Sequence, residues 1–502
     1  MTDEPNFVQI ARREKLEALV EKGVTPFAYR FSRTHLAADA VRSVPDTQQD
    51  EGQTVRVAGR LVSWRSAGKT AFAHLADPSG RIQLYFKRDV LGDDVFAEVK
   101  LYDLGDVVGV EGPLFRTRTG EVTVRVSRVE LLAKSLRPLP FGKEEVVDGV
   151  VVRHSGFADE EQRSRQRYAD LAVHPEVRHL FRARSRMISS LRSYLDAQDY
   201  LEVETPILQP VYGGAFARPF VTHHNTLDMP LYLRIADELY LKRLIVGGME
   251  RVYEIGHDFR NEGIDRTHNP EFTMLEFYEA YADYHVMMER VEQLLVTAAT
   301  AVKEALTAVK DARGDQVPQL ATPFPRIEWA SALNAAVGAE VLAMDDATLR
   351  NAARRAGVEH VDALSRPKLL DELFQVFVEA TLEAPTFVLD YPLELSPLAK
   401  PKRGNVALTE RFELFARGRE LANAFSELND PIDQRRRFEA QARLRAAGDE
   451  EAPGVDEDYL RAMEYGMPPT GGVGIGVDRL FMYLTGTANI RDVILFPTLR
   501  PE

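Results

Sequence analysis

The residues best able to do chemistry form two motifs, each with an arginine, about 200 residues apart. The first reads Phe-Arg-Asn-Glu at 259–262 and is followed closely by a histidine and a phenylalanine. The second is the glycine-rich run 472–479, which ends in an arginine and leads into an apolar segment. Glycines let a backbone approach a ligand closely, and the start of a helix favours anions. Together the motifs predict a nucleotide site, with the candidate residues Arg260, Glu262, His268, Phe272 and Arg479.

The segment 272–278 reads as a strand, because alternate residues would share one face. That face would carry Phe272, Met274, Glu276 and Tyr278. We expect the preceding segment to pair with it as a hairpin with a long tip around 263–269. Since an unpaired buried carboxylate is costly, these groups either form internal salt bridges or receive a ligand. The density of charges and rings favours a ligand site.

Two further glutamates flank a tight turn near Ala416, which would set Glu413 opposite Glu420 across a hairpin. Like charges in that position destabilise a sheet unless something neutralises them. Oxygen ligands of this kind suit Mg²⁺, which relies on one or two carboxylates plus phosphate. The pair therefore predicts a magnesium site; the alternative is two solvated glutamates on a sheet edge.

A third pattern follows at 423–427, where Asn423, Phe425 and Glu427 would share a strand face. An amide, an apolar ring and a carboxylate in a row match a ligand with a polar head, an aliphatic stem and a cationic tip. An ordinary amphipathic strand would show the same alternation.

The composition limits the classes of protein. A chain of 502 residues, 45% apolar and 28% charged, predicts two or three globular domains. It contains no cysteine, which excludes disulfides, thiolate zinc sites and thiol nucleophiles and fits a reducing compartment. The acidic N-terminus lacks the apolar core of a signal peptide, and no apolar run approaches the ~18 residues of a membrane span. We therefore expect a cytoplasmic protein that does not enter a membrane.

The net charge of −14 argues against nucleic acid as a partner, but the charge is unevenly distributed. Residues 55–135 carry 13 basic and 10 acidic side chains, so this region is mildly basic within an acidic chain. Such a module could bind RNA, although this is a weak signal and the balance of charges favours solvated surface charge.

The elements that must position these residues indicate an α+β protein. Residues 1–50 are expected to form a helical extension, with a helix over 7–21 whose basic residues are either solvated or in contact with RNA. Short alternating runs over 51–137 predict a small barrel of the OB-fold type, which binds oligonucleotides on one face. A linker at 138–173, with a short strand at 146–152, leads to a large domain at 174–502. A helical insertion is expected there around 326–384.

The arginine motifs resemble motifs 2 and 3 of class II aminoacyl-tRNA synthetases, and the chain resembles the bacterial-type lysyl family of subgroup b along nearly its whole length. Residues 191–209 resemble motif 1, and the runs at 213–215, 222–225, 240–243 and 396–399 also resemble this family. The resemblance implies an OB-fold barrel that binds the anticodon and a catalytic antiparallel sheet flanked by helices. It also implies a homodimer joined partly through motif 1.

The resemblance also implies a role for each matching residue. Arg260 would contact the α-phosphate of ATP and the carboxylate of the amino acid. Glu262 would meet the adenine amino group, and Phe272 would stack on adenine. His268 and Arg479 would hold the outer phosphates.

The remaining roles concern metal, amino acid and anticodon. Mg²⁺ would lie on Glu413 and Glu420. Lysine would meet Gly214 and Glu238 with its α-amino group, Asn423 with its carboxylate, Phe425 with its stem, and Glu276, Tyr278 and Glu427 with its ε-ammonium. In the barrel, the residues that resemble anticodon-reading positions are Phe72, Gln83 and Glu121.

The resemblance thus implies ATP-dependent attachment of L-lysine to tRNA(Lys) through a lysyl-adenylate, releasing AMP and pyrophosphate. No protein nucleophile is required, which agrees with the absence of cysteine. An aspartate- or asparagine-specific enzyme shares the architecture, but an aspartate pocket would need a cation where this chain offers Glu238, Glu276 and Glu427. A paralogue that lysylates a protein would not need the barrel. A non-catalytic RNA-binding protein would be expected to lack some of the key arginines and glutamates.

The sequence departs from the family pattern in the linker. Between Pro140 and Arg163 the chain is longer than the pattern, and Ser155-Gly156-Phe157 replaces a usual His-Gly-Leu element. This departure concerns the connection between domains and leaves the site residues intact.

Overall fold

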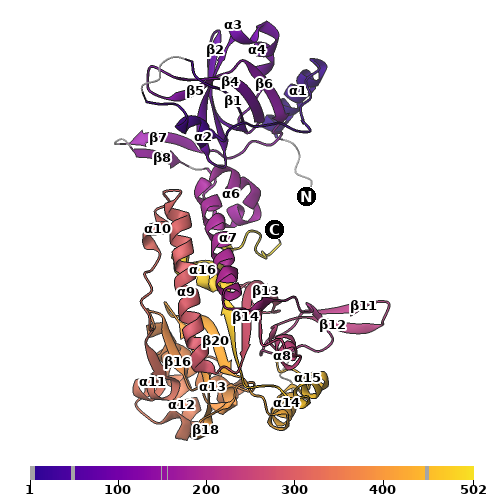
Figure 1. Cartoon of the computed structure of the whole chain (residues 1–502), viewed down its shortest axis with the longest axis vertical. Helices are drawn as coiled ribbons and strands as arrows, with labels where there is room; N and C mark the ends of the chain where they lie inside the picture. Colours follow the sequence, from indigo (N-terminus) through magenta and orange to yellow (C-terminus); the bar gives the residue numbers. More distant parts are fainter. Residues whose placement is uncertain (1–5, 47–50, 148–149, 155, 447–450, 502) are drawn as a thin grey trace. The chain divides into compact units, whose positions relative to one another are not determined.

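The computed structural model describes residues 6–46, 51–147, 150–154, 156–446 and 451–501. The chain divides into two compact units, Met1–Val173 and His174–Glu502 (Figure 1). Each unit has its own hydrophobic core. In the described residues, no helix is long and apolar enough to cross a membrane.

The first unit is built on a six-stranded barrel in the order β1-β2-β3-β5-β4-β6, with β1 also paired to β4. Alternate residues of β2 and β3 are buried, because one face of each strand lines the barrel core. The strands are β1 Thr54–Ala67, β2 Thr70–Asp77, β3 Gly80–Lys87, β4 Val107–Arg116, β5 Val122–Arg125 and β6 Arg128–Ala133. The short helices are α2 Ala37–Arg42, α3 Arg88–Leu91 and α4 Asp93–Val99. The predicted barrel of the OB-fold type is confirmed.

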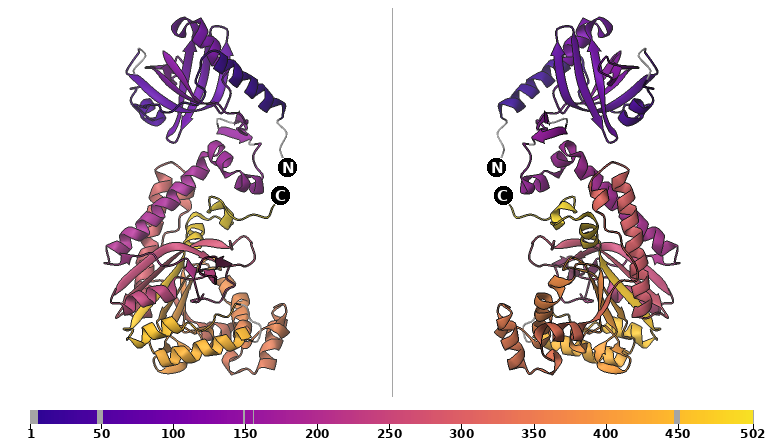
Figure 2. Two further views of the ribbon diagram at one scale, coloured as in Figure 1. Left: turned by 90° about the vertical axis from the view of Figure 1, so that its right-hand side faces the viewer. Right: turned by 90° about the vertical axis from the view of Figure 1, so that its left-hand side faces the viewer.

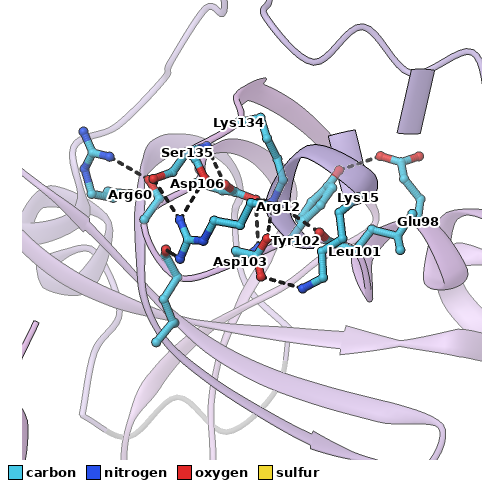
Figure 3. Close-up of polar contacts among 12 residues, drawn as sticks. Arg12, Lys15, Arg60, Glu98, Leu101, Tyr102, Asp103, Asp106, Lys134 and Ser135 are labelled. Atoms are coloured by element: carbon cyan, nitrogen blue, oxygen red, sulfur yellow. Dashed lines mark hydrogen bonds and ion pairs between the residues drawn. The ribbon is translucent and has the colours of Figure 1, made fainter. Parts of the chain in front are cut away.

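The helix α1 (Phe7–Glu21) spans the predicted residues, and two of its basic side chains anchor it to the barrel. Arg12 is buried and donates to the carbonyl oxygens of Ser135 at 2.8 Å and Leu104 at 2.9 Å (Figure 3). Lys15 pairs with Asp103 at 2.5 Å. The expected solvated face is therefore wrong for Arg12, whereas RNA contact by the basic residues of this helix stays a prediction. The partners of Arg12 and Lys15 lie about 90 to 120 residues away in sequence, so local pattern could not reveal them.

A separate hairpin follows the barrel, formed by β7 (Lys143–Val147) and β8 (Val150–His154). Sequence predicted a single short strand at 146–152, whereas the structure has two strands in this region. Asp148, Gly149 and Ser155 lie outside the described residues, so the structure does not describe the whole of the Ser155-Gly156-Phe157 departure. Two helices complete the unit, α5 (Glu160–Arg165) and α6 (Arg167–Val173).

The second unit is built around an eight-stranded sheet in the order β15-β16-β19-β20-β21-β14-β13-β9. The central strands are antiparallel, but the two edge strands pair in parallel, so the sheet is mixed. Its strands are β9 Leu201–Glu202, β13 Arg251–Phe259, β14 Glu271–Ala280, β15 Arg326–Glu328, β16 Thr386–Leu389, β19 Arg411–Phe415, β20 Glu420–Ser426 and β21 Thr470–Gly476. Smaller sheets pair β10 Leu208–Gln209, β11 Val221–His224 and β12 Met229–Leu233, and β17 Pro401–Lys402 with β18 Asn405–Thr409.

Two long helices, α7 (Pro175–Asp196) and α9 (Tyr284–Thr307), run side by side along one face of the sheet (Figure 2). The buried residues of α7, Leu180, Ala183, Met187, Leu191 and Leu195, recur at helical spacing. They join Leu275 and Phe277 of β14 in the main core. Odd-numbered residues of β14 therefore face the helices, which leaves the even-numbered residues on the opposite face.

The remaining helices lie around this sheet. Between β15 and β16 the chain forms its own helical core from α11 Trp329–Val337, α12 Asp346–Arg355 and α13 Arg366–Phe377, with short turns η1 Val341–Ala343, η2 Val361–Ala363 and η3 Glu379–Thr381. The others are α8 Glu238–Val246, α10 Arg313–Gln316, α14 Pro431–Ala446, α15 Glu457–Glu464, α16 Val477–Thr485, η4 Leu393–Leu395 and η5 Ile490–Asp492.

Candidate active site

A cavity of about 860 Å³ opens on the sheet face opposite the two long helices. Its lining includes Phe272, Met274, Glu276 and Tyr278, the even-numbered residues of β14 that were predicted to share a face. Every residue predicted for nucleotide, metal and amino acid lines this cavity. The anticodon candidates lie in the other unit.

At the nucleotide end, β13 and β14 form the predicted hairpin, with Phe259 opposite Glu271 and a long tip between them. The guanidinium of Arg260 lies 5.0 Å from the ring centre of Phe272. Its Nε is buried and has no hydrogen-bond partner within the described part of the chain. Glu262 lies in the exposed tip and also lines the cavity. A cation with an unused donor beside an aromatic ring fits a phosphate next to a planar base.

The two arginine motifs meet through His268. Arg479 Nη2 lies 2.9 Å from His268 Nε2, and His268 Nδ1 lies 2.8 Å from Asp265. Because Arg479 can only donate, Nε2 accepts and Nδ1 carries the proton given to Asp265. Burial opposes ionisation of Asp265, but hydrogen bonds from Thr267 and His268 hold its pKa well below the usual range. The outer-phosphate candidates are therefore already joined to each other.

Arg479 follows the glycine-rich strand as predicted, because β21 ends at Gly476 and α16 begins at Val477. Arg479 Nη1 also lies 3.7 Å from Glu420 Oε2. This contact connects the phosphate side of the cavity with one of the two metal candidates.

The expected register of the two metal candidates is wrong. Glu413 pairs with Asn423, and Glu420 pairs with Phe415, so the glutamates are not directly opposite. The turn at Arg417 and Gly418 has positive φ at both residues, and a bulge follows in the ladder. Both carboxylates nevertheless line the cavity. Burial, against the attraction of Arg411 and with repulsion from Glu420, raises the pKa of Glu413 to about 7.

The donor set around these glutamates fits a magnesium ion shared with phosphate. In the described residues, no three His, Asp or Glu side chains are arranged to hold a metal ion by themselves. Two carboxylates with mutual repulsion are the usual protein share of a Mg²⁺ site in which phosphate supplies further oxygens. Sequence reasoning missed Asp371 and Glu379, which enter the same lining from the helical region. Burial, and then repulsion by Glu420 and Asp371, raises the pKa of Glu379 to about 7.

At the other end, four acidic or phenolic groups converge from three elements: Glu238 from α8, Glu276 and Tyr278 from β14, and Glu427 just after β20. Tyr278 donates to Glu276 Oε2 at 3.0 Å. The side chain of Glu427 is only 1% exposed. Burial, with repulsion by Asp258 and Glu238, raises the pKa of Glu276 well above its ordinary value. This end can hold a cation deep in the cavity.

Arg411 joins the two ends, and sequence reasoning missed it. It donates to Asn423 Oδ1 at 3.1 Å and pairs with Glu413. Its guanidinium also lies 5.6 Å from the ring centre of Phe425. Its position two residues before Glu413 on one strand was the available signal, since such residues share a face.

Two glycines provide the space for a ligand. Gly214 has φ +90°, and a Cβ there would lie 2.9 Å from the Cβ of Ala236. A Cβ on Gly472 would overlap both Glu427 Oε1 and the ring of Tyr278. The cavity beside these carboxylates therefore depends on the absence of a side chain at these two positions.

The anticodon candidates come together on the barrel surface. Phe72 of β2 stacks on Tyr85 of β3 with ring centres 4.7 Å apart. Gln83 donates to Glu121 at 2.6 Å, and His74 lies 2.7 Å from the same carboxylate. Tyr85 and His74 were missed. They lie directly opposite Phe72 and Gln83 across the pairing of β2 with β3, of which only the run 81–86 was predicted as a strand. Rings beside hydrogen-bonding groups suit unpaired bases.

Comparison with known families agrees with this division. A family model described as class II tRNA synthetases (D, K and N) matches residues 159–500. A model described as an OB-fold nucleic acid binding domain matches residues 55–132.

Similar proteins cover the whole chain. A lysine–tRNA ligase of Moorella thermoacetica is 52% identical over 99% of this chain and 98% of its own length. One from Oceanobacillus iheyensis is 48% identical over 100% of both chains. One from Enterococcus faecalis is 49% identical over 99% of this chain and 98% of its own.

Proposed function

The chain belongs to the class II lysine–tRNA ligases, and we propose that the cavity of its second unit joins L-lysine to ATP before the lysyl group passes to tRNA(Lys). The observation that carries the choice of amino acid is the convergence of Glu238, Glu276 and Glu427 at one end of the cavity. An aspartate side chain would find no complementary cation in that group.

ATP lies at the end of the cavity that holds both arginine motifs. Arg260 binds the α-phosphate with the donor that the structure leaves unused, and Phe272 packs against adenine, whose amino group meets Glu262. His268 and Arg479 exchange their mutual hydrogen bond for contacts with the outer phosphates. Mg²⁺ would be held by Glu413 and Glu420, where it would neutralise phosphate charge.

Lysine lies at the acidic end with its carboxylate toward Arg260 and Asn423. Gly214 and Glu238 receive the α-amino group, and Phe425 packs on the aliphatic stem. The ε-ammonium binds Glu276, Tyr278 and Glu427. This order matches the polar head, apolar stem and cationic tip that 423–427 predicts.

The reaction needs no protein nucleophile. An oxygen of the lysine carboxylate attacks the α-phosphorus, the bond to the β-phosphate oxygen breaks, and pyrophosphate leaves. A hydroxyl of the terminal tRNA ribose then attacks the lysyl carbonyl, and AMP leaves. Arg260 and Arg479 accelerate the first step by aligning the two substrates and stabilising the charge that develops on phosphate.

The enzyme also acts as a homodimer joined through the motif 1 region. There Leu201, Ile207 and Leu208 are large apolar residues that remain exposed, and β9 forms an edge of the main sheet. Exposed apolar groups beside an unpaired edge favour a protein partner. Sedimentation of the Ile207→Asp/Leu208→Asp variant should show a shift toward monomer, whereas an unchanged dimer would exclude this surface.

The test of the function is amino-acid-dependent ATP–pyrophosphate exchange with Mg²⁺, each of the twenty amino acids being assayed separately, followed by tRNA charging. We expect exchange with lysine alone. Exchange with aspartate or asparagine would overturn the pocket assignment while keeping the class. The absence of exchange with any amino acid would favour a non-catalytic RNA-binding protein.

A further inference from the structure

A lysine of the protein itself lies behind the acidic end of the cavity. Lys242, one turn after Glu238 on α8, is completely buried and is not part of the cavity lining. Its ammonium forms ion pairs with both Glu238 and Glu427. A buried cation between the two carboxylates assigned to different ends of the substrate requires an explanation, because burying a charge is costly.

In each of the two carboxylates, one oxygen pairs with Lys242 and the other lies beside a glycine that shapes the cavity. Glu238 Oε1 pairs with Lys242, while Oε2 lies 3.8 Å from the position of a Cβ on Gly214. Glu427 Oε2 pairs with Lys242, while Oε1 lies where a Cβ on Gly472 would stand. Apart from its ion pair, the side chain of Glu427 has no hydrogen-bond partner among the described residues. Each glutamate therefore keeps one oxygen for a ligand.

The charges of these three side chains depend on one another. Burial raises the pKa of Glu427 to about 8, with repulsion by Glu238 adding to the effect and attraction by Lys242 opposing it. Burial lowers the pKa of the Lys242 ammonium, but the two carboxylates outweigh it, so the pKa of Lys242 is raised and its charge is kept. Two carboxylates around one ammonium leave a single negative charge. The other charged or titratable groups around them are Arg243, Glu276, Tyr278, Arg411, Asp456 and Tyr459.

We propose that Lys242 is a positioning residue for amino-acid specificity: it holds Glu238 and Glu427 turned toward the cavity and offsets one of their two charges, which leaves one negative charge for the substrate's ammonium when both are ionised. This role rests on the proposed function, because it takes lysine as the ligand. Without Lys242 the two glutamates repel each other with no offsetting cation, so both become ionised only at a higher pH than in the unsubstituted chain. A protonated carboxyl group is a poor partner for an ammonium, so lysine would bind well only at higher pH.

The experiment compares Lys242→Met with Lys242→Arg and with the unsubstituted chain. The KM values for lysine and ATP are measured by ATP–pyrophosphate exchange from pH 6.5 to 9.5, alongside thermal melting. For Lys242→Met we expect the KM for lysine to rise roughly 100-fold at pH 7, as for loss of one partner of a buried charge pair. The KM for ATP should change less than about 3-fold, and the lysine defect should shrink above pH 9.

Lys134 provides a matched control, since it is also fully buried between two carboxylates, Asp103 and Asp106, but lies in the barrel. Lys134→Met should lower thermal stability without moving either KM. If Lys242→Met does not fold, Lys242→Arg still tests the role, because it keeps the charge. Its pH profile for lysine should match the unsubstituted chain even if the KM changes.

Three results would overturn the role. They are an unchanged lysine KM and pH profile in Lys242→Met, equal rises in the KM for lysine and ATP at every pH, and a displaced pH profile in Lys242→Arg. Normal lysine-dependent exchange in the unsubstituted chain, together with any of these, would remove the role of Lys242 alone. No lysine-dependent exchange in the unsubstituted chain would overturn the proposed function and this role with it.

Discussion

Two protein cations connect the groups that we assign to different parts of the substrates. Arg411 touches Asn423 and Glu413, so it ties an amide assigned to lysine to a carboxylate assigned to metal. Lys242 connects Glu238, assigned to the α-amino group of lysine, with Glu427, assigned to its ε-ammonium. Since both cations are already paired with carboxylates of the protein, a ligand meets only the net charge that remains after this pairing. Near Glu427 that remainder is negative.

The Glu427→Gln substitution should impair lysine far more than ATP. It removes the charge beside the ε-ammonium and leaves Lys242 with one partner, so the KM for lysine should rise about 100-fold or more. The KM for ATP should stay within a few-fold, because the nucleotide lies at the other end of the cavity. Exchange kinetics with each substrate varied in turn would measure both. Equal losses would contradict the assignment.

Lysine binding should strengthen as the pH rises toward about 8. Burial raises the pKa of Glu427 to about 8, so this carboxyl is largely protonated below that pH and ionises above it. The ε-ammonium keeps its proton until about pH 10, so this end of the substrate does not titrate in the window. Equilibrium dialysis of lysine without ATP, between pH 6 and 9, should show a falling dissociation constant. A flat profile would show that Glu427 is already ionised at pH 6.

The sequence predicts which residues share a strand face, but it does not predict which residues are buried by contacts with distant parts of the chain. Asn423, Phe425 and Glu427 were placed on one face by simple alternation, and they line one cavity. Lys242 resembles a surface lysine on an amphipathic helix. Its burial depends on Glu427 and on Tyr459, which is about 200 residues further along the chain, so no local pattern reveals it.

Among the elements, the strand β21 has the strongest influence on the space for a ligand. Its glycines let β14 and β20 bring Tyr278 and Glu427 close together without side chains between them. A glycine-rich run predicted a close approach of backbone and ligand. The approach that the structure shows is to the protein's own acidic groups.

The Gly472→Ala substitution should therefore abolish use of lysine. The added methyl group would overlap Glu427 Oε1 and the Tyr278 ring, and strand and side chains could relieve the overlap only by moving into the pocket. We expect lysine-dependent exchange to fall by roughly 100-fold or more, as for other buried clashes of a few kcal/mol. Gly156→Ala in the first unit, where a Cβ meets nothing, is the control. Near-normal exchange in Gly472→Ala would mean that the pocket adapts.

The limits of sequence reasoning at the element scale appear in the hairpin of β19 and β20. The turn was predicted close to where it lies, but the predicted pairing of Glu413 with Glu420 was wrong. The number of residues in the loop and a bulge set the register, and neither follows from residue types alone. Both carboxylates still line the cavity, although they are not paired directly opposite each other.

The molecule as a whole separates two recognition tasks. The cavity residues all come from the second unit, and the anticodon candidates come from the first. The sequence predicted this division from the change between alternating and helical patterns. It could not predict the partners of Arg12, which hold α1 to the barrel through contacts distant in the chain.

Substitutions on the barrel surface should separate the two tasks. In a Phe72→Ala/Gln83→Ala variant, we expect lysine-dependent exchange to remain within about 2-fold, since these residues lie outside the catalytic unit. Charging of tRNA should weaken at least 10-fold, because base–aromatic stacking contributes about 1–3 kcal/mol per base. Phe7→Ala on the exposed part of α1 is a control for loss of an aromatic residue. Unaltered charging would exclude this surface from anticodon recognition.

The hydrogen bond between His268 and Arg479 means that part of the conformational entropy of the phosphate site is lost in folding and not on nucleotide binding. These residues lie 211 positions apart, and the bond fixes the hairpin tip against the start of α16 before any nucleotide arrives. The conformational entropy of bringing them together is therefore lost during folding. An incoming phosphate oxygen needs only to replace His268 Nε2 as the acceptor of the Arg479 hydrogen bond. A phosphate that binds here would therefore meet an arginine whose position the hairpin tip has already fixed.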